Sequence, residues 1–318
     1  MVMTPRPTPR FTRAAIAPWL DRRLVGLTRL CAVGVAGVLG AIALVIIWQA
    51  QPAIAQLGFS FLWQREWNPV AGREAYGALP LIYGTLMTAL IALGLAVPVG
   101  VGTALCLSED WLPRWLRLIF TFGVELLAAI PSVVYGLWGI FVVLPRLRAV
   151  GNWLHVHWGA VPLFSAPASG PGLLPAGVVL AIMILPIIAA ISRDSLAALP
   201  PELRQASLSL GATRWETLLR VLLPAAASGI GGGIMLALGR ALGETMAVTM
   251  LIGNAHQISP ALFAPASTIA SLLANQFSEA QGLQVAALMY AALVLLGMTL
   301  LVNILAVAIV QGVRSRAG

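Results

Sequence analysis

Long apolar stretches alternate with short polar segments along the chain, and this pattern predicts membrane-spanning helices. A helix needs about 20 mostly apolar residues to cross a bilayer. The third and fifth apolar stretches are irregular, because the third contains Glu125 and Pro131 and the fifth contains Arg240 and Glu244. We therefore predict an all-α membrane protein with six transmembrane helices, at residues 25–48, 79–107, 118–144, 172–192, 225–253 and 283–310.

Composition supports a membrane protein and excludes other classes. The chain is 59% hydrophobic and 9% charged, whereas globular chains are about 45–50% apolar and about 25% charged. A soluble enzyme or a nucleic-acid-binding protein is therefore not expected, despite the net charge of +8. All 19 basic residues are arginine, so the phosphate-binding loop that needs a lysine is absent and this chain should not bind ATP in that way. Cys31 and Cys106 lie in apolar stretches, and neither a disulfide nor a metal site is expected.

Arginine positions predict the orientation in the membrane. Cytoplasmic segments of membrane proteins are enriched in Lys and Arg. With both termini in the cytoplasm, 14 arginines fall inside when Arg29, at the start of the first span, is counted with the N-terminal arm; 4 fall outside, and Arg240 lies in a span. Residues 1–24 then form a cytoplasmic N-terminal arm and residues 25–48 an anchor helix. A cleavable signal peptide is disfavoured because the first apolar stretch is longer than the 7–15 residues typical of one, about 24 residues here.

The segment 199–224 should lie in the cytoplasm between two spans, and it reads as two short helices. Pro201 fits the first turn of one helix and Gly211 fits the position just after its end. Thr213 and Glu216 have the spacing of a capping box that begins the second helix, whose apolar side includes Trp215. Such an amphipathic hairpin either lies on the lipid surface or inserts into a groove of a partner protein.

This hairpin resembles the EAA loop of the permeases of ABC importers, a pattern of E-A-A, three residues, Gly, nine residues and I-x-L-P. The resemblance implies the type I ABC importer permease fold, with the hairpin coupling the permease to an ATPase. Two positions differ from the pattern, because Gln205 replaces the Glu and Ser207 replaces the second Ala. The coupling residues implied are Gln205, Ala206, Gly211, Thr213, Trp215, Glu216, Leu223 and Pro224.

Further motifs are similar to those of the phosphate-specific importer, and within it to the permease subunit type called C. They are NPVAG at 68–72, ALPLIYGTL at 78–86, IPSVVYGLWGIFVV at 130–143 and GRALGETMAVTMLIGN at 239–254. The resemblance implies a permease core at 75–312 in a bacterial inner membrane. It also implies three partners, which are a homologous permease subunit, an ATPase dimer that holds ATP and Mg²⁺, and a phosphate-binding protein outside. This chain itself should bind no cofactor, contact lipid and bind no nucleic acid.

Charged residues inside predicted spans are candidates for the transport path, because charges in the bilayer are costly and usually face a cavity or one another. Arg240 and Glu244 are four residues apart and would share one face of a continuous helix. They are either a buried structural ion pair or a cation on the path of an anion with its carboxylate partner. Glu125 is a weaker path candidate, since it lies near a span end where it can also reach water.

Glycines and histidines suggest further sites that we interpret as structural. The glycines around 229–243 either pack helices closely or offer backbone N–H groups to an anion, and packing is the preferred reading. His155 and His157 have no evident third ligand, so no metal is expected. An intramembrane serine protease is disfavoured because no predicted span contains a histidine. The sequence specifies a path for an anion in a protein that is not itself an enzyme, and the resemblance implies that this anion is inorganic phosphate. A permease for another oxyanion and a stand-alone anion channel are the alternatives.

Overall fold

The computed structural model describes residues 18–317, except for 71 and 109–111, and describes side chains between residues 23 and 308 within those limits. Residues 1–17 of the predicted N-terminal arm lie outside the described residues. The chain divides into two compact units, Met1–Trp48 and Gln49–Gly318, and each is described by itself.

The first unit contains most of helix α1, which runs from Pro18 to Leu57 and extends past the predicted anchor at both ends. Most of its apolar side chains are exposed, including those of Leu30, Val33 and Trp48. A helix that is hydrophobic on all sides and lacks protein cover suits a lipid environment. The role of residues 25–48 as a membrane anchor stays a prediction.

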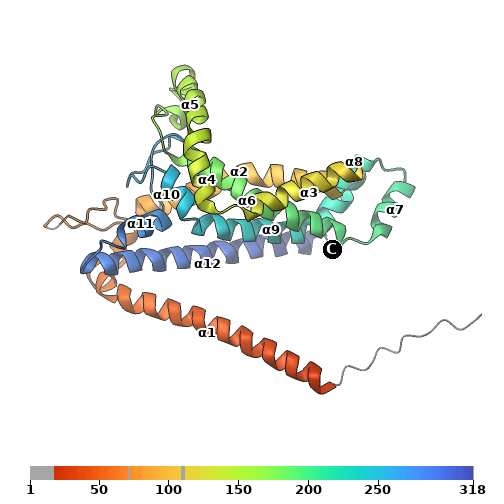
Figure 1. Ribbon diagram of the computed structural model, residues 1–318, viewed down its shortest axis with the longest axis horizontal. Coiled ribbons are helices and arrows are strands. Elements are labelled where there is room, and N and C mark those ends of the chain that lie inside the picture. Colours follow the sequence, from red (N-terminus) through yellow and green to blue (C-terminus); the bar gives the residue numbers. More distant parts are fainter. Residues whose placement is uncertain (1–17, 71, 109–111, 318) are drawn as a thin grey trace, which may run out of the picture. The chain divides into compact units, whose positions relative to one another are not determined.

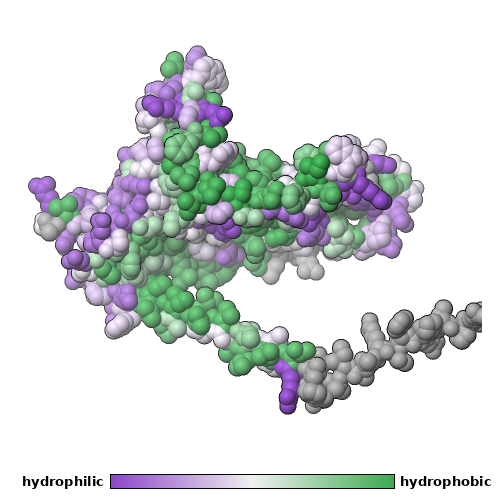
Figure 2. All heavy atoms as spheres, viewed as in Figure 1, coloured by the Kyte–Doolittle hydropathy of each residue, from purple (hydrophilic) through white to green (hydrophobic). Residues whose placement is uncertain are grey.

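The second unit is a helical bundle in which α2, α6, α9 and α12 lie side by side, with α3 against α6 (Figure 1). Hydrophobic residues gather along the bundle, and hydrophilic residues gather toward its two ends (Figure 2). Its elements are η1 (Gly58–Leu62), α2 (Leu79–Ser108), α3 (Arg114–Ala129), α4 (Ser132–Trp138), η2 (Gly139–Val143), α5 (Leu144–Trp158), η3 (Pro162–Phe164), α6 (Leu173–Ala197), α7 (Pro201–Ser209), α8 (Arg214–Glu216), η4 (Thr217–Leu222), α9 (Leu223–Gly243), α10 (Met246–Leu251), α11 (Ile269–Gln276) and α12 (Leu283–Ala317).

Six helices among the described residues are long and apolar enough to cross a membrane, as the sequence predicts. Three of them, the second, fourth and sixth, match predicted spans closely, and the first, at 23–62, contains the predicted 25–48 but is longer. The other two, at 132–158 and 214–243, differ from the predicted 118–144 and 225–253 in where the helices begin and end.

The predicted third span is wrong as one continuous helix, because the chain breaks at Ile130–Pro131. The backbone of Ile130 is extended, with ψ of 129°, so α3 ends at Ala129 and α4 begins at Ser132. A proline disfavours helical geometry in the residue before it. Pro131 thus separates two helices within the apolar stretch that the sequence predicts as one irregular span.

The predicted fifth span is also wrong at both ends. The helix ends at Gly243, and Glu244 adopts an extended conformation with ψ of 122° before the short helix α10. At its start, α8, η4 and α9 follow one another without a break, so the second helix of the hairpin continues into the span.

Both π-helical turns in the described residues precede a proline. η2 comes before Pro145 and η4 comes before Pro224. Proline lacks an N–H, and its ring collides with the carbonyl four residues earlier in an α-helix. A wider turn at this point lets the helix continue past the proline.

The core of the second unit centres on α6, the most buried of the six long helices. Small residues let neighbouring helices approach it closely. A Cβ added to Gly177 of α6 would lie 2.5 Å from the Cγ2 of Ile91 on α2, and one added to Gly229 of α9 would overlap Ser195 of α6. This confirms close packing as a role of part of the glycine cluster.

Candidate functional site: the coupling hairpin and the charged residues of the path

The first helix of the hairpin, α7, begins and ends where the sequence predicts. Pro201 occupies its first turn, where a missing N–H leaves no hydrogen bond unmade. Gly211 follows the helix with φ of +87°, a left-handed conformation that glycine adopts without a steric penalty. The N–H groups of Leu210 and Gly211 donate to the carbonyls of Ala206 and Leu208. The turn between the helices is therefore fixed by local hydrogen bonds.

A capping box begins the second helix, as predicted. The N–H of Glu216 donates to the Oγ1 of Thr213 at 3.3 Å, and the N–H of Thr213 donates to the Oε2 of Glu216 at 2.9 Å. Thr213 has an extended backbone, with ψ of 163°, and helix α8 begins at Arg214. The two reciprocal bonds satisfy N–H groups that a helix end leaves without partners.

A buried hydrogen bond joins the two helices of the hairpin. The hydroxyls of Ser207 on α7 and Thr217 on η4 lie 2.9 Å apart, and both residues are buried. Ser207 is one of the two positions that depart from the EAA pattern, so this departure supplies a polar contact that an alanine would lack. Sequence reasoning missed Thr217, because its partner is ten residues away on another helix.

The apolar side of the second helix divides between the protein core and the surface. Leu218 and Leu222 are 1% and 4% exposed. In contrast, Trp215 and Leu219 are 59% and 51% exposed, and Leu210 at the end of α7 is 88% exposed. We call these three residues the docking face. Of the remaining predicted coupling residues, Gln205, Ala206, Gly211, Thr213, Glu216 and Pro224 are exposed and Leu223 is half-buried.

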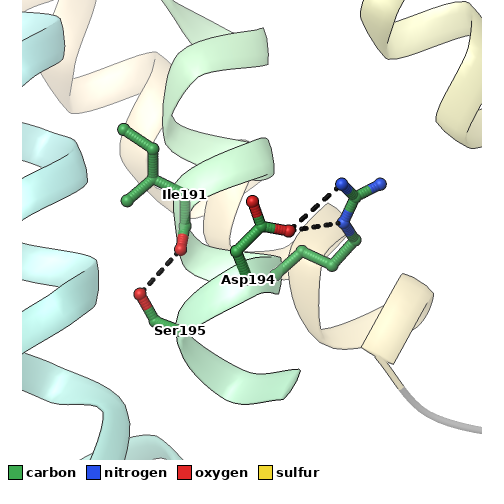
Figure 3. A network of polar contacts seen from close by, with 4 residues as sticks. Ile191, Asp194 and Ser195 are labelled. Atoms are coloured by element: carbon green, nitrogen blue, oxygen red, sulfur yellow. Dashed lines mark hydrogen bonds and ion pairs between the residues drawn. The ribbon is translucent and has the colours of Figure 1, made fainter. Parts of the chain in front are cut away.

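The end of α6 that leads into the hairpin carries a polar group that sequence reasoning did not select (Figure 3). The Nε and Nη2 of Arg193 donate to the Oδ1 of Asp194 at 3.2 and 3.1 Å. Ser195 donates to the carbonyl of Ile191 at 2.7 Å, within its own helix, and this hydroxyl lies against Gly229. The adjacent charges can compensate each other near the membrane boundary.

Arg240 and Glu244 are not arranged as the predicted pair. Arg240 lies in the last turn of α9 and is exposed, whereas Glu244 lies beyond the helix end and is half-buried. The Oε1 of Glu244 instead accepts a hydrogen bond from the N–H of Ala247, at 3.4 Å, in the first turn of α10. No ion pair joins Arg240 and Glu244 among the described residues, because the extended backbone at 244 removes the one-turn spacing.

Arg240 lies close enough to Tyr135 of α4 to act on its hydroxyl electrostatically. That hydroxyl donates to the carbonyl of Leu127, at 2.8 Å, and thereby satisfies an acceptor at the end of α3. Beside it lies an apolar cavity of about 280 Å³ lined by Leu127, Ile130, Val134, Tyr135, Trp138 and Ile182. The cation therefore lies near the break between α3 and α4, where the helical path is interrupted.

Glu125 and the histidines have other surroundings. Glu125 is exposed on α3, and none of the side chains of this fully described helix is buried. The Nδ1 of His155 lies 2.8 Å from the carbonyl of Phe164, and the ring of His157 stacks on Trp153 at 4.6 Å between centroids. In the described part of the chain, no group of three or more His, Cys, Asp or Glu side chains is placed to hold a metal ion.

The sequence of this chain is similar to those of known membrane transport proteins. Residues 96–315 match the family described as binding-protein-dependent transport system inner membrane component. The chain is 43% identical to the phosphate transport system permease protein PstC of Pasteurella multocida, over 92% of each chain. It is 44% identical to that of Mesorhizobium japonicum, over 92% of this chain and 90% of the relative. The chain therefore belongs to the binding-protein-dependent inner-membrane transport components and, within them, to the PstC permease family.

Solved structures share the fold at lower identity. A bacterial alginate ABC transporter in complex with an alginate-bound periplasmic protein aligns with a TM-score of 0.60 at 16% identity, covering 91% of this chain and 95% of that one. The MetNI methionine ABC transporter aligns with a TM-score of 0.53 at 20% identity, covering 74% and 94%. The described helices thus have the fold of type I ABC importer permeases, as predicted.

Proposed function

We propose that this chain is the transmembrane permease subunit of an ATP-driven importer of inorganic phosphate. The observation that carries the proposal is the identity of 43% and 44%, over at least nine tenths of each chain, to permeases named for phosphate transport. Because the match covers nearly the whole length, it includes both the hairpin and the charged residues of the path.

The hairpin is the site that couples the permease to ATP hydrolysis. Its turn and helix start are fixed by Gly211 and the Thr213–Glu216 capping box, and its docking face is exposed. A preorganised apolar helix face suits insertion into a groove of a partner. The partner is an ATPase dimer that holds ATP and Mg²⁺, and this chain contributes no catalytic group and no cofactor of its own.

Arg240 supplies positive charge to the phosphate path, and Glu244 limits how tightly the anion is held. The exposure of Arg240 at the end of α9 supports contact with a substrate or with the second permease across the path. Conduction needs binding that is strong enough for entry and weak enough for release. Glu125 is a weaker candidate, since it is exposed on α3 at a distance from this site along the chain.

The complete transporter contains a homologous permease subunit and a phosphate-binding protein on the outer side, in addition to the ATPase dimer. Both termini of this chain lie in the cytoplasm and the chain is in the bacterial inner membrane. The arginine distribution of 14 inside and 4 outside supports this orientation.

Stimulation of ATP hydrolysis tests the proposal. The assembled complex in lipid nanodiscs should hydrolyse ATP faster with binding protein and phosphate than with binding protein and sulfate. Leu219→Asp on the docking face should abolish the stimulation, whereas Leu163→Asp, at an equally exposed leucine outside the hairpin, should leave it intact. Stimulation by sulfate in place of phosphate would support the alternative of another oxyanion, and conduction without an ATPase would support a channel.

A further inference from the structure

Helix α5 projects out of the bundle (Figure 1). In Figure 1, α6, α9 and α12 lie along the long axis of the second unit, whereas α5 projects at a steep angle to them. It does so toward the end that carries α10 and α11, away from the hairpin helices α7 and α8. α5 is the last part of the helix at 132–158, which is long and apolar enough to cross a membrane. Its steep angle to α6, α9 and α12 instead places α5 along the plane of the membrane. With the orientation proposed above, this end of the bundle is the outer one.

One side of α5 is fixed to the protein. Gly151 is buried, and a Cβ at this position would lie 2.5 Å from the Cε1 of Phe263 and 2.6 Å from the Cβ of Ala168. The N–H of Ala168 donates to the Oδ1 of Asn152 at 3.0 Å. These contacts set the rotation of α5 about its own axis, so the opposite side is held away from the protein.

That opposite side carries a defined set of exposed residues. Arg146, Val150, Trp153 and His157 follow one another at intervals of three and four, which places them on one helix face. Val150, Trp153 and Val156 are 54%, 56% and 77% exposed. We call these five residues the outer stripe. It combines apolar and aromatic side chains with positive charge.

The segment that contains α5 carries positive charge only. Residues 145–171 contain Arg146, Arg148 and two histidines but no Asp or Glu. Both arginines are exposed, and the Nη1 of Arg146 donates to the carbonyl of Val142 at 2.6 Å. Tryptophan is enriched where membrane meets water, and helices with basic and aromatic residues on an apolar surface bind anionic lipid. The outer stripe therefore complements the boundary between headgroups and acyl chains.

We propose that α5 is an interfacial helix that lies on the outer leaflet and binds the headgroups of anionic phospholipids. Arg146 contacts the lipid phosphates, and Trp153 and Val156 insert between the headgroups and the acyl chains. The proposal depends on the orientation given under the proposed function, but it does not depend on which anion the protein transports. Its consequence is that lipid composition acts on the outer side of the permease, at the far end of the helix that begins after the break between α3 and α4.

Quenching by spin-labelled lipids tests this placement in the assembled transporter in vesicles. A bimane label is attached to Val156→Cys in a chain that also carries Cys31→Ser and Cys106→Ser. Lipids with a nitroxide near the headgroup should quench this label strongly, and aqueous iodide should quench it weakly. The same label on Ser165→Cys, an exposed loop position beyond α5, should show the reverse. Quenching of both labels by iodide alone would overturn the proposal in favour of a surface open to water. Protection of Val156→Cys from both quenchers would overturn it in favour of a protein partner.

The charge preference is tested with the same label. Spin-labelled phosphatidylglycerol should quench Val156→Cys more than spin-labelled phosphatidylcholine. Arg146→Gln should reduce this preference about fivefold, since one basic residue near a charged surface contributes about 1 kcal/mol. Arg148→Gln, on another side of α5, should reduce it less. Arg65→Gln, at an exposed arginine in another loop, should not change it. Equal quenching by the two lipids would overturn the role of the arginines. Lipid quenching in a complex that fails to import phosphate would refute the proposed function and leave this proposal standing.

Discussion

At the scale of single residues, Arg240 and Glu244 have separate environments. The sequence left open a structural ion pair and a cation on the anion path with its carboxylate partner, and both readings placed the two charges on one helix face. Instead, Glu244 accepts a hydrogen bond from the first turn of α10 while Arg240 stays exposed. An exposed guanidinium without an ion pair in the described structure keeps its charge available for an anion.

We therefore expect Arg240→Gln to reduce phosphate uptake by tenfold or more in an intact complex, because a hydrogen bond to a charged group contributes about 1.5–3 kcal/mol. Arg240→Lys is the matched control and should retain part of the activity, since it keeps the charge. Uptake is measured in vesicles containing the copurified complex. Near-normal transport by the Arg240→Gln/Glu244→Gln pair would show that the two charges only compensate each other.

Local sequence rules predicted the structure of the hairpin, but they did not predict the contacts of the charged residues on the transport path. The spacing of Thr213 and Glu216 predicted the capping box, and Gly211 predicted the turn, because both features depend on a few neighbouring residues. The Ser207–Thr217 contact and the proximity of Arg240 to Tyr135 depend on how helices pack, which spacing does not reveal.

At the scale of elements, close packing of α6 against α9 depends on Gly229. Its missing side chain leaves room for Ser195, whereas Gly232, three residues further along α9, has open space around it. The two glycines thus differ in packing while sharing one helix.

Gly229→Ala should destabilise the protein by about 1–3 kcal/mol, because the added methyl overlaps Ser195. Gly232→Ala should leave the free energy of unfolding unchanged or raise it, since alanine is the better helix former. Thermal unfolding of the purified chain in detergent compares them, and Ser195→Gly should partly restore Gly229→Ala. Equal midpoints for the two alanine variants would contradict the packing argument.

The hairpin should behave as one element because a buried hydrogen bond joins its helices. Ser207→Ala leaves the Thr217 hydroxyl without this hydrogen-bond partner and should lower the free energy of unfolding by about 1–3 kcal/mol. The double variant Ser207→Ala/Thr217→Val should lose less free energy of unfolding than the two single variants lose together. Ser209→Ala, at an exposed position on α7, serves as the control and should have little effect. Additive costs in a double-mutant cycle would show that the two hydroxyls act independently.

Element boundaries were predictable where composition alone decides them. The apolar stretches at 79–107 and 172–192 became α2 and α6 within a few residues. Hydropathy does not detect a backbone break inside an apolar stretch, so the end of α3 at Ala129 and the end of α9 at Gly243 were missed. Pro131 indicated the first break, but whether a proline kinks or ends a helix depends on the packing around it.

At the scale of the whole molecule, the account requires one orientation in the membrane. Single cysteines at Ser165 and Ser278, in a background without Cys31 and Cys106, should react with an impermeant thiol reagent added outside cells. A cysteine at Ser209 should react only after the membrane is permeabilised. All three positions are exposed, so a difference in labelling reports the side of the membrane. Labelling of Ser209→Cys from outside would contradict the cytoplasmic hairpin.

Directional transport tests the central claim, that this permease couples ATP hydrolysis on one side to phosphate entry from the other. The measurement is uptake of radioactive phosphate by vesicles that hold the assembled complex, with ATP enclosed and the loaded binding protein outside. The account predicts that phosphate accumulates inside only with ATP, that sulfate does not accumulate, and that Leu219→Asp stops accumulation while the permease remains in the membrane. Phosphate entry that is independent of ATP, or ATP-driven accumulation of sulfate in its place, would contradict it.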